Sequence, residues 1–258
     1  MDHETILLEQ RGHIGTITLN RPEKMNTFTT EMARELIQSF LGLDNDQECR
    51  VIVVRGAGRA FSTGIDISEF FGKSPREYEE WVGDMEEMIL VIARMKKPVI
   101  ASAHGYVVAN GAGLLLACDL AVVAEGTKIG TTAINAGLFC MGPAVPLSRH
   151  LGKKRCLEML LTGDLIDANV AEQWGLVNRV VPLDQLEEAT MDLAQKLAGK
   201  SPIALQMGKQ AYYGMLDMEL GKAMEYSNQM FTTLCMTDDA GEGVRAFLEK
   251  RKPRWKGR

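Results

Sequence analysis

The stretch Pro98–Asp119, PVIASAHGYVVANGAGLLLACD, decides the fold of this chain. An apolar run at 99–103 predicts a buried strand, a glycine-rich turn follows it, and an apolar helix is expected at about 110–117. Gly111 and Gly113 allow a ligand to approach the backbone closely, and the first amides of a helix have no acceptor inside it. The stretch therefore predicts a backbone site for an oxyanion.

A second stretch upstream repeats this arrangement. Residues 51–55 are apolar and predict a strand, GAG at 56–58 breaks it, and FSTGID at 61–66 leads into a short helical pattern. Asp66 occupies the position from which a side chain caps the start of a helix. The chain therefore contains two units in which a strand, a tight turn and a helix follow one another.

Several segments resemble a known family. AFSTGID at 60–66 resembles the crotonase (enoyl-CoA hydratase/isomerase) signature A-F-x-x-G-x-D, and HGYVVANGAG at 104–113, followed by Cys118-Asp119, resembles the second signature of that family. The resemblance extends over nearly the whole chain. It is also carried by LNRPEKMN at 19–26, LLTGDLIDANVAEQWGLVNRVVP at 160–182 and AFLEKRKPRW at 246–255. Together these motifs are highly specific for the fold and much less specific for the reaction.

Length and composition indicate an ordinary soluble protein. The chain has 258 residues, 46% hydrophobic and 24% charged, which suffices for one large core or a core with an appendage. No apolar run reaches about 18 residues and no signal-peptide pattern is present, so we expect no membrane span and a cytoplasmic location. A net charge of −5 argues against nucleic acid as a partner.

Other kinds of site find no support in the sequence. The five cysteines are scattered without a C-x-x-C pair, and the four histidines are dispersed, which argues against a disulfide framework and a zinc site. A dinucleotide loop would need a third glycine where Phe61 lies, and Gly72-Lys73-Ser74 lacks the upstream glycine of a P-loop. We expect no metal and no cofactor, with coenzyme A entering only as part of the substrate.

Alternating strand and helix patterns place the chain in the α/β class. Strands are predicted at 4–10, 13–20, 51–55, 99–103 and 119–124, and helices from Thr29 or Thr30, at 75–96, 143–150, 153–162 and 167–174. From about residue 200 the pattern is entirely helical. The resemblance implies a crotonase-like spiral of ββα units at 1–198 and a C-terminal helical region at 199–258. It also implies packing of this region on neighbouring subunits of a homotrimer, or of a hexamer built as a dimer of trimers.

The resemblance further implies how an acyl-CoA thioester is bound. Two backbone amides hold the thioester carbonyl, and their positions here are Ile65 and Asn110. Because the donors belong to the main chain, these side chains can differ without loss of the donors. Further substrate-binding positions by the same resemblance are Phe61, Gly64, Asp66, Ile67, Gly111 and Thr132, with Lys24, Phe247 and Lys250 for the coenzyme A part. For the two lysines, a role as plain solvated side chains is an equal alternative.

The chain departs from the family at the residues that transfer protons. A hydratase of this family uses two glutamates, and in this chain their positions hold Gly113 and Ala133, neither of which can transfer a proton. A third position, which some relatives use for an aspartate, holds Cys140 or Met141. The usual hydration mechanism therefore cannot be assigned to this chain.

Three hypotheses about function remain open. The first is an enzyme of the hydratase/isomerase type whose protons move through other groups, namely Asn110, Thr131, Thr132, Asn135, Cys140, or a water or anion in a cavity left by Gly113 and Ala133. The second is an acyl-CoA hydrolase in which water or Cys140 attacks the thioester. The third is an acyl-CoA-binding protein without turnover. Considered individually, Cys140 is favoured as a buried structural thiol, His104 as a loop residue and Asp66 as a helix cap.

Overall fold

The computed structural model describes residues 4–258, and its strands form two sheets. Within that range the main sheet has the order β1-β2-β3-β4-β6-β9 and the smaller sheet the order β5-β7-β8. In the main sheet β1 and β2 run antiparallel and the other neighbours run parallel. The strands are β1 (Ile6–Arg11), β2 (Ile14–Leu19), β3 (Val51–Gly56), β4 (Val99–Ala103), β5 (Tyr106–Val108), β6 (Leu120–Ala124), β7 (Lys128–Gly130), β8 (Leu165–Asp167) and β9 (Arg179–Val181).

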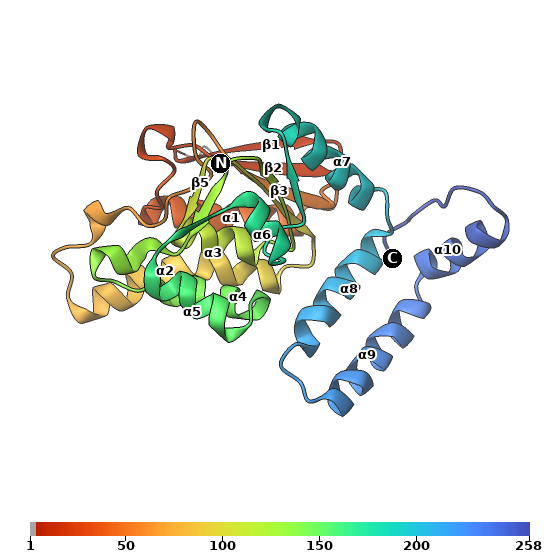
Figure 1. Ribbon diagram of the computed structural model, residues 1–258. Helices are drawn as coiled ribbons and strands as arrows, with labels where there is room; N and C mark the ends of the chain where they lie inside the picture. The colour runs from red at the N-terminus through yellow and green to blue at the C-terminus, as the bar shows by residue number, and fades with distance from the viewer. Residues whose placement is uncertain (1–3) are drawn as a thin grey trace.

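The helices cover both faces of the main sheet and then continue into a C-terminal arm (Figure 1). The α-helices are α1 (Thr30–Asn45), α2 (Pro75–Arg94), α3 (Asn110–Ala117), α4 (Met141–His150), α5 (Lys153–Thr162), α6 (Ala168–Gln173), α7 (Leu186–Ala198), α8 (Pro202–Met215), α9 (Leu220–Cys235) and α10 (Asp238–Leu248). Short 3-10 helices are η1 (Pro22–Lys24), η2 (Ile67–Glu69), η3 (Thr132–Ala136) and η4 (Leu183–Gln185). The predicted α/β class is confirmed.

Alternation along β3 explains the two-sided packing. Successive side chains of a strand point to opposite faces of the sheet. Ile52 and Val54 lie in the larger core with α1, α2 and α3, whereas Val51 and Val53 lie in the smaller core with α7. A continuous apolar run is therefore needed here, because both faces of this strand are buried.

Helix α2 matters most for the site, and its start is set by local sequence. Ser74 accepts a hydrogen bond from the amide of Glu77, and the Glu77 carboxylate accepts from the amide of Ser74, which forms a capping box. Pro75 follows at the first helical position, where its missing N–H costs nothing. The buried face carries Trp81, Met85, Met88, Ile89, Val91 and Ile92, as expected from their helical spacing.

Short elements escaped prediction for a physical reason. Strand β5 lies inside the turn that we expected at 104–109, and its three residues are too few to show a period. Strands β7, β8 and β9 are equally short, and no prediction covered α7. These elements are specified by pairing and packing between distant parts of the chain.

The C-terminal arm, α8 to α10, projects away from the sheets (Figure 1). No residue of α8 or α9 is buried. The exposed apolar side chains of this arm are Tyr212, Leu216, Met218, Leu220, Met224, Phe231, Met236, Val244, Phe247 and Leu248. Within residues 4–258 no helix is long and apolar enough to cross a membrane.

Asp119 anchors the arm to the sheet. Its carboxylate accepts hydrogen bonds from the amide of Val99 at 2.7 Å, from Nζ of Lys209 at 2.7 Å and from the hydroxyl of Tyr213 at 2.9 Å. The side chains of Asp119 and Lys209 are only 16% and 6% exposed. One carboxylate therefore links the start of β4 to α8, which begins the arm.

We predict that Asp119→Ala destabilises the fold by about 3 kcal/mol, because it leaves the Lys209 ammonium buried without its partner. The measurement is the free energy of unfolding in denaturant. Asp217→Ala is the matched control, since it removes an exposed ion pair with Arg149 and should leave the unfolding midpoint nearly unchanged. Equal losses in both variants would contradict the anchoring role.

Candidate active site

The amide of Ile65 is a free donor held in a fixed direction. The amide of Phe28 donates to the carbonyl of Gly64 at 2.8 Å, and the amide of Asp66 donates to the carbonyl of Phe28 at 2.8 Å. Because successive amides of an extended chain point to opposite sides, the N–H of Ile65 points away from Phe28. Within residues 4–258 no backbone or side-chain group accepts a hydrogen bond from it.

The amide of Asn110 is a second free donor. Asn110 is the first residue of α3, so its N–H has no acceptor inside the helix. The preceding Ala109 has φ 50° and ψ −123°, a conformation that side-chain-bearing residues rarely adopt, and its amide donates to the carbonyl of Gly130 at 2.9 Å. The chain thus accepts backbone strain at the residue that turns β5 into α3.

Two glycines bring these donors together. A Cβ at Gly64 would lie 2.7 Å from Cβ of Ala109 and 3.3 Å from the nitrogen of Asn110. A Cβ at Gly111 would collide with the carbonyl oxygen of Ser62. The loop that carries Ile65 and the start of α3 are therefore in direct backbone contact. This is the arrangement of two neighbouring amides that the sequence predicts, while their role in binding stays a prediction.

A polar network supports the loop from behind. Nη2 of Arg21 donates to Asp66 at 2.9 Å, and Nη1 of Arg21 donates to the carbonyl of Thr27 at 2.6 Å. Nδ2 of the buried Asn26 donates to the carbonyls of Ala57 and Ala60. These hydrogen bonds hold the backbone before Ile65, at Ala57 and Ala60, and the side chain after it, at Asp66.

Asp66 caps the helix that follows, as predicted. Its Oδ1 accepts hydrogen bonds from the amide and the hydroxyl of Ser68 at the start of η2. Burial would raise the pKa of Asp66, but the hydrogen bonds from Ser68 and Arg21 outweigh it and lower that pKa to about 2. Asp66 therefore stays ionised and serves the loop.

The space beside Gly113 is filled. A Cβ at Gly113 would lie 2.8 Å from Cδ1 of Ile89 and 3.1 Å from Cγ of Pro143. The expectation of a cavity left by Gly113, able to hold a water or an anion, is therefore wrong, because two apolar side chains occupy that position. Ala133, in η3, is partly buried and packs against the larger core.

Three of the proposed proton-transfer candidates have structural roles. The hydroxyl of Thr131 donates to the carbonyl of Met159 at 2.8 Å, and Nδ2 of Asn135 donates to the carbonyl of Gly163. Cys140 is buried, and burial raises the pKa of its thiol, which disfavours the thiolate. His104 is a loop residue whose Nε2 lies 2.8 Å from the carbonyl oxygen of Gly58.

The side chain of Asn110 is unusual. It is 6% exposed, and its buried Nδ2 has no hydrogen-bond partner within residues 4–258. Buried polar atoms without partners are rare, and each one calls for a specific explanation. A hydrogen-bond acceptor on a bound ligand would be one such explanation. Both the backbone N–H and the side-chain Nδ2 of Asn110 therefore stay candidates for ligand binding.

The remaining predicted positions are only partly assembled. Phe61 is fully buried and supports the site from behind, Ile67 is 72% exposed, and Lys24 is exposed at the end of η1. Thr132 begins η3 beside Ala133. The 83% exposed Phe247 lies near the end of α10, and Lys250 follows that helix (Figure 1).

One carboxylate near the site is not predicted by any sequence pattern. Glu86 lies on α2, three residues before Ile89, at the edge of the buried face. Its carboxylate occupies the space that a side chain at Gly142 would fill, and burial raises its pKa. The only signal in the sequence was an acidic residue beside the apolar face of a helix. Surface glutamates on α2 have the same position, so this signal does not single out Glu86.

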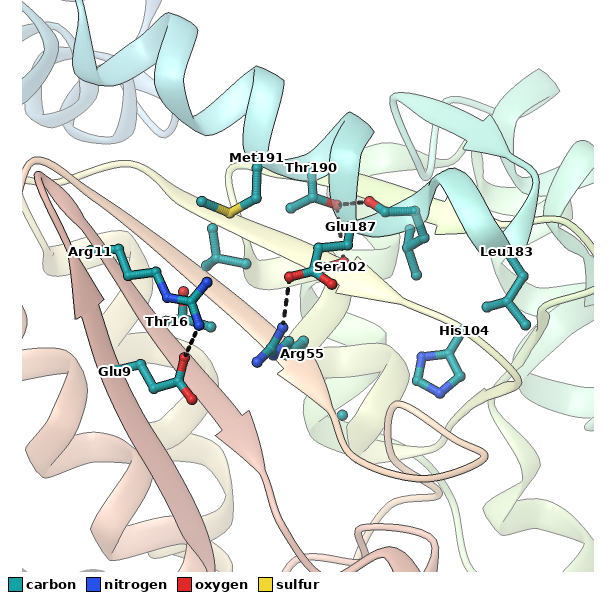
Figure 2. Close-up of a pocket in the computed structure, with 13 residues that line it drawn as sticks. Glu9, Arg11, Thr16, Arg55, Ser102, His104, Leu183, Glu187, Thr190 and Met191 are labelled. Atoms are coloured by element: carbon teal, nitrogen blue, oxygen red, sulfur yellow. Dashed lines mark hydrogen bonds and ion pairs between the residues drawn. The ribbon is translucent and has the colours of Figure 1, made fainter.

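A separate cavity of about 190 Å³ lies between the main sheet and α7 (Figure 2). Arg55 forms an ion pair with Glu187 across it, and the hydroxyl of Thr190 donates to Ser102 at 3.0 Å. Arg11 and Glu9 pair at its rim. Of the residues weighed from the sequence, His104 lines this cavity and the predicted acyl-CoA site residues do not, and the charged groups of the cavity already have partners. A second cavity, of about 340 Å³, lies beside α8.

Comparisons with known proteins agree with one another. The family model described as Enoyl-CoA hydratase/isomerase matches residues 9–258. A probable enoyl-CoA hydratase of Rhizobium meliloti is 35% identical over 261 residues, covering 100% of each chain. The human enoyl-CoA hydratase domain-containing protein 3, mitochondrial, is 35% identical over 247 residues, covering 95% of this chain and 82% of that protein. The crystal structure of an enoyl-CoA hydratase from Mycobacterium smegmatis has a TM-score of 0.95 and 35% identity, covering 98% of this chain and 99% of that one.

We predict that Gly64→Ala is more destabilising than Gly126→Ala, measured as the free energy of unfolding in denaturant. Both glycines have positive φ, 96° and 76°, so both variants bear a backbone cost of about 1–2 kcal/mol. Only at Gly64 does the new Cβ meet another segment, whereas nothing lies within 4 Å at Gly126. The clash should add about 1–3 kcal/mol. Equal losses would show that the close approach of the two amides is unimportant for the fold.

We predict that Asp66 makes the protein sensitive to acid. Since the pKa of Asp66 is lowered from 3.8 to about 2 in the folded state, its stabilisation is present above about pH 4 and is lost as pH falls toward 2. The contribution at neutral pH is about 2 kcal/mol. Unfolding free energies measured between pH 2 and 7 should therefore fall less steeply in Asp66→Asn than in the wild type. Parallel curves would contradict this assignment.

Proposed function

The chain belongs to the enoyl-CoA hydratase/isomerase family, and from that premise we propose that it is an enzyme that binds an acyl-CoA thioester. The crotonase fold expected from the sequence is confirmed by the similarity to solved structures of this family. The observation that carries the functional proposal is the pair of adjacent free amides, Ile65 and Asn110. They would donate to the thioester oxygen.

The two amides stabilise the negatively charged oxygen of an enolate more than the neutral oxygen of the thioester carbonyl. When a proton leaves the carbon beside a thioester carbonyl, negative charge develops on the oxygen. Donors already held in place stabilise that charge without reorganising, and each contributes on the order of 3 kcal/mol in acyl-transfer enzymes. The backbone contacts at Gly64 and Gly111 supply this fixed geometry. The proposed function is therefore enolate chemistry on an acyl-CoA.

Hydration by the usual pair of glutamates is not part of this proposal. Gly113 and Ala133 carry no carboxylate, and general acid–base groups typically contribute about 10²–10⁴-fold each. The contacts of Ile89 and Pro143 at Gly113 also mean that a glutamate introduced there would have to displace them. We expect little hydration of crotonyl-CoA, even with both amides intact.

Two alternatives differ in their support. Hydrolysis by a Cys140 nucleophile is disfavoured, because burial and the nearby Glu86 carboxyl both raise the pKa of this thiol and keep it protonated. Binding without turnover is favoured by one observation, the absence of both family glutamates. Enolate chemistry and binding without turnover share the acyl-CoA site, and they differ in whether a proton of the acyl chain is transferred.

The coenzyme A end of the ligand is proposed to be completed by a second subunit. Phe247 belongs to α10 and Lys250 follows this helix, which is part of the arm that projects away from the sheets (Figure 1). The arm exposes a row of apolar side chains that one chain leaves uncovered. A homotrimer, or a dimer of trimers, would cover this surface and bring the two residues to a neighbouring site.

We predict that the protein binds an acyl-CoA and that Ile65→Pro weakens this binding about tenfold, because proline removes the donor amide. Calorimetric titration with a saturated acyl-CoA provides the measurement. Ile65→Ala is the matched variant, since it keeps the amide and should retain most of the affinity. Absence of wild-type binding at millimolar ligand, or equal loss in both variants, would refute the amide assignment.

We predict a homo-oligomer that depends on the arm. Light scattering should give the mass of three or six chains at micromolar concentration, and Phe231→Asp should lower it, because a charge is introduced into the apolar row on α9. Glu225→Gln, on the same helix, should leave the mass unchanged. A wild-type monomer would rule out the shared coenzyme A site.

A further inference from the structure

Glu86 is a partly buried acid without a structural task. Within residues 4–258 it makes no hydrogen bond or ion pair with another side chain or with the backbone, whereas the adjacent Glu87 pairs with Arg94 at 2.8 Å. On the other side, Asp84 pairs with Arg34. A partly buried carboxyl that makes no hydrogen bond or ion pair in the free protein suggests a function.

The carboxyl of Glu86 contacts a short segment that also touches both positions where family glutamates are missing. It lies against Gly142, at the start of α4. The next residue, Pro143, touches the Gly113 position, with its Cγ 3.1 Å from a Cβ built there. Two residues before Gly142, the Cys140 thiol interacts with the backbone of Ala133. One short segment, 140–143, therefore connects Glu86 to both positions.

Helix α2 also explains why Gly113 is glycine. Ile89, one turn after Glu86, extends its Cδ1 into the space that a side chain at position 113 would need. The same helix thus fills the Gly113 position with an apolar group and provides a carboxyl nearby. Asn110 and Gly113 are separated by three residues of α3, about 4.5 Å along the helix axis. The acid and the oxyanion amides therefore lie in one region.

The surroundings allow Glu86 to change its protonation state. Burial raises the pKa of Glu86 above that of an exposed carboxyl, while the partial positive charge at the start of α4 favours the ionised form. The Cys140 thiol, at the N-cap of α4, is the titratable group that interacts with Glu86, and this thiol is itself protonated. A carboxyl with a raised pKa is a stronger base than an exposed one and a usable acid in return.

We propose that Glu86 is the catalytic carboxyl of this site and that it carries a proton between two carbons of an acyl-CoA, an inference that rests on the proposed function. One carboxyl that accepts and returns the same proton is sufficient for moving a double bond. Hydration would need an acid and a base that position a water between them, and the described residues offer a single unpaired carboxyl here.

The proton shift balances without any other reactant. The Glu86 carboxylate takes a proton from the carbon beside the thioester carbonyl of a 3-enoyl-CoA, and the C–H electron pair becomes a carbon–carbon double bond while the carbonyl pair moves to oxygen. The amides of Ile65 and Asn110 hold that oxygen. Glu86 then returns the proton to the fourth carbon of the chain. The pair of the original double bond between the third and fourth carbons forms this C–H bond, the enolate carbon–carbon pair becomes the double bond between the second and third carbons, the pair on oxygen restores the carbonyl, and the conjugated 2-enoyl-CoA is released.

The experiment compares the wild type with Glu86→Gln and the neighbouring control Glu87→Gln. The probe is 3-hexenoyl-CoA, with the double-bond shift followed by absorbance of the conjugated thioester and deuterium uptake followed by mass spectrometry in D₂O. Calorimetry with hexanoyl-CoA measures binding separately. We expect Glu86→Gln to bind normally and to lose about 10²–10⁴-fold in rate, and Glu87→Gln to match the wild type.

A second variant and a pH profile separate catalysis from packing. Glu86→Asp keeps a carboxyl and should retain more activity than Glu86→Gln. Because the ionised form is the base, the wild-type rate should rise with pH through the pKa of Glu86, and this rise should disappear in Glu86→Gln. A purely structural residue would not produce such a change in the profile.

The outcomes distinguish the two levels of the proposal. A rate in Glu86→Gln within tenfold of the wild type would overturn the role of Glu86. So would a wild type that binds hexanoyl-CoA but neither shifts the double bond nor takes up deuterium, although acyl-CoA binding would stand. If the wild type binds no acyl-CoA at all, the proposed function itself is wrong.

Discussion

The structure depends on the close approach of two backbone segments, the loop at 62–66 and the start of α3. Gly64 and Gly111 permit this contact, since a Cβ at either position would collide with the other segment. The strained Ala109 turns β5 into α3 at the same place. Phe28, Arg21 and other groups behind the loop fix the direction of its amides. Two donors without acceptors result, and these are the basis of the proposed chemistry.

The chain keeps the close backbone contact of this cradle, while Gly113 and Ala133 stand at the positions where the family resemblance places glutamates. A backbone N–H donor is present whatever the side chain of its residue, so Ile65 and Asn110 are compatible with the site. A side-chain carboxylate, in contrast, is lost when a glutamate is replaced by glycine or alanine. Two side chains of α2 fill the space beside these positions: Ile89 lies against Gly113, and Glu86 lies against Gly142. In the proposed chemistry, binding and proton transfer are thus assigned to different elements.

The sequence predicted the parts of the fold whose signals are local. The capped start of α2 at Ser74, the apolar strand β3 and the glycine-rich entry to α3 were all expected near their observed bounds. Strand β5 and the filled space at Gly113 were not, because both depend on partners distant in sequence. Glu86 was missed for the same reason: its importance comes from Gly142, 56 positions later, and no helical period indicates that contact.

The central claim is that the amides of Ile65 and Asn110 donate together to a thioester oxygen. Infrared difference spectroscopy of bound acyl-CoA, labelled with ¹³C at the thioester carbonyl, tests it most directly, because hydrogen bonds to the oxygen weaken the C=O bond. We predict that the carbonyl stretch of the bound ligand shifts to lower frequency in the wild type and that Ile65→Pro loses much of this shift. A bound carbonyl that absorbs at the same frequency as in water, or an unchanged shift in Ile65→Pro, would contradict the account.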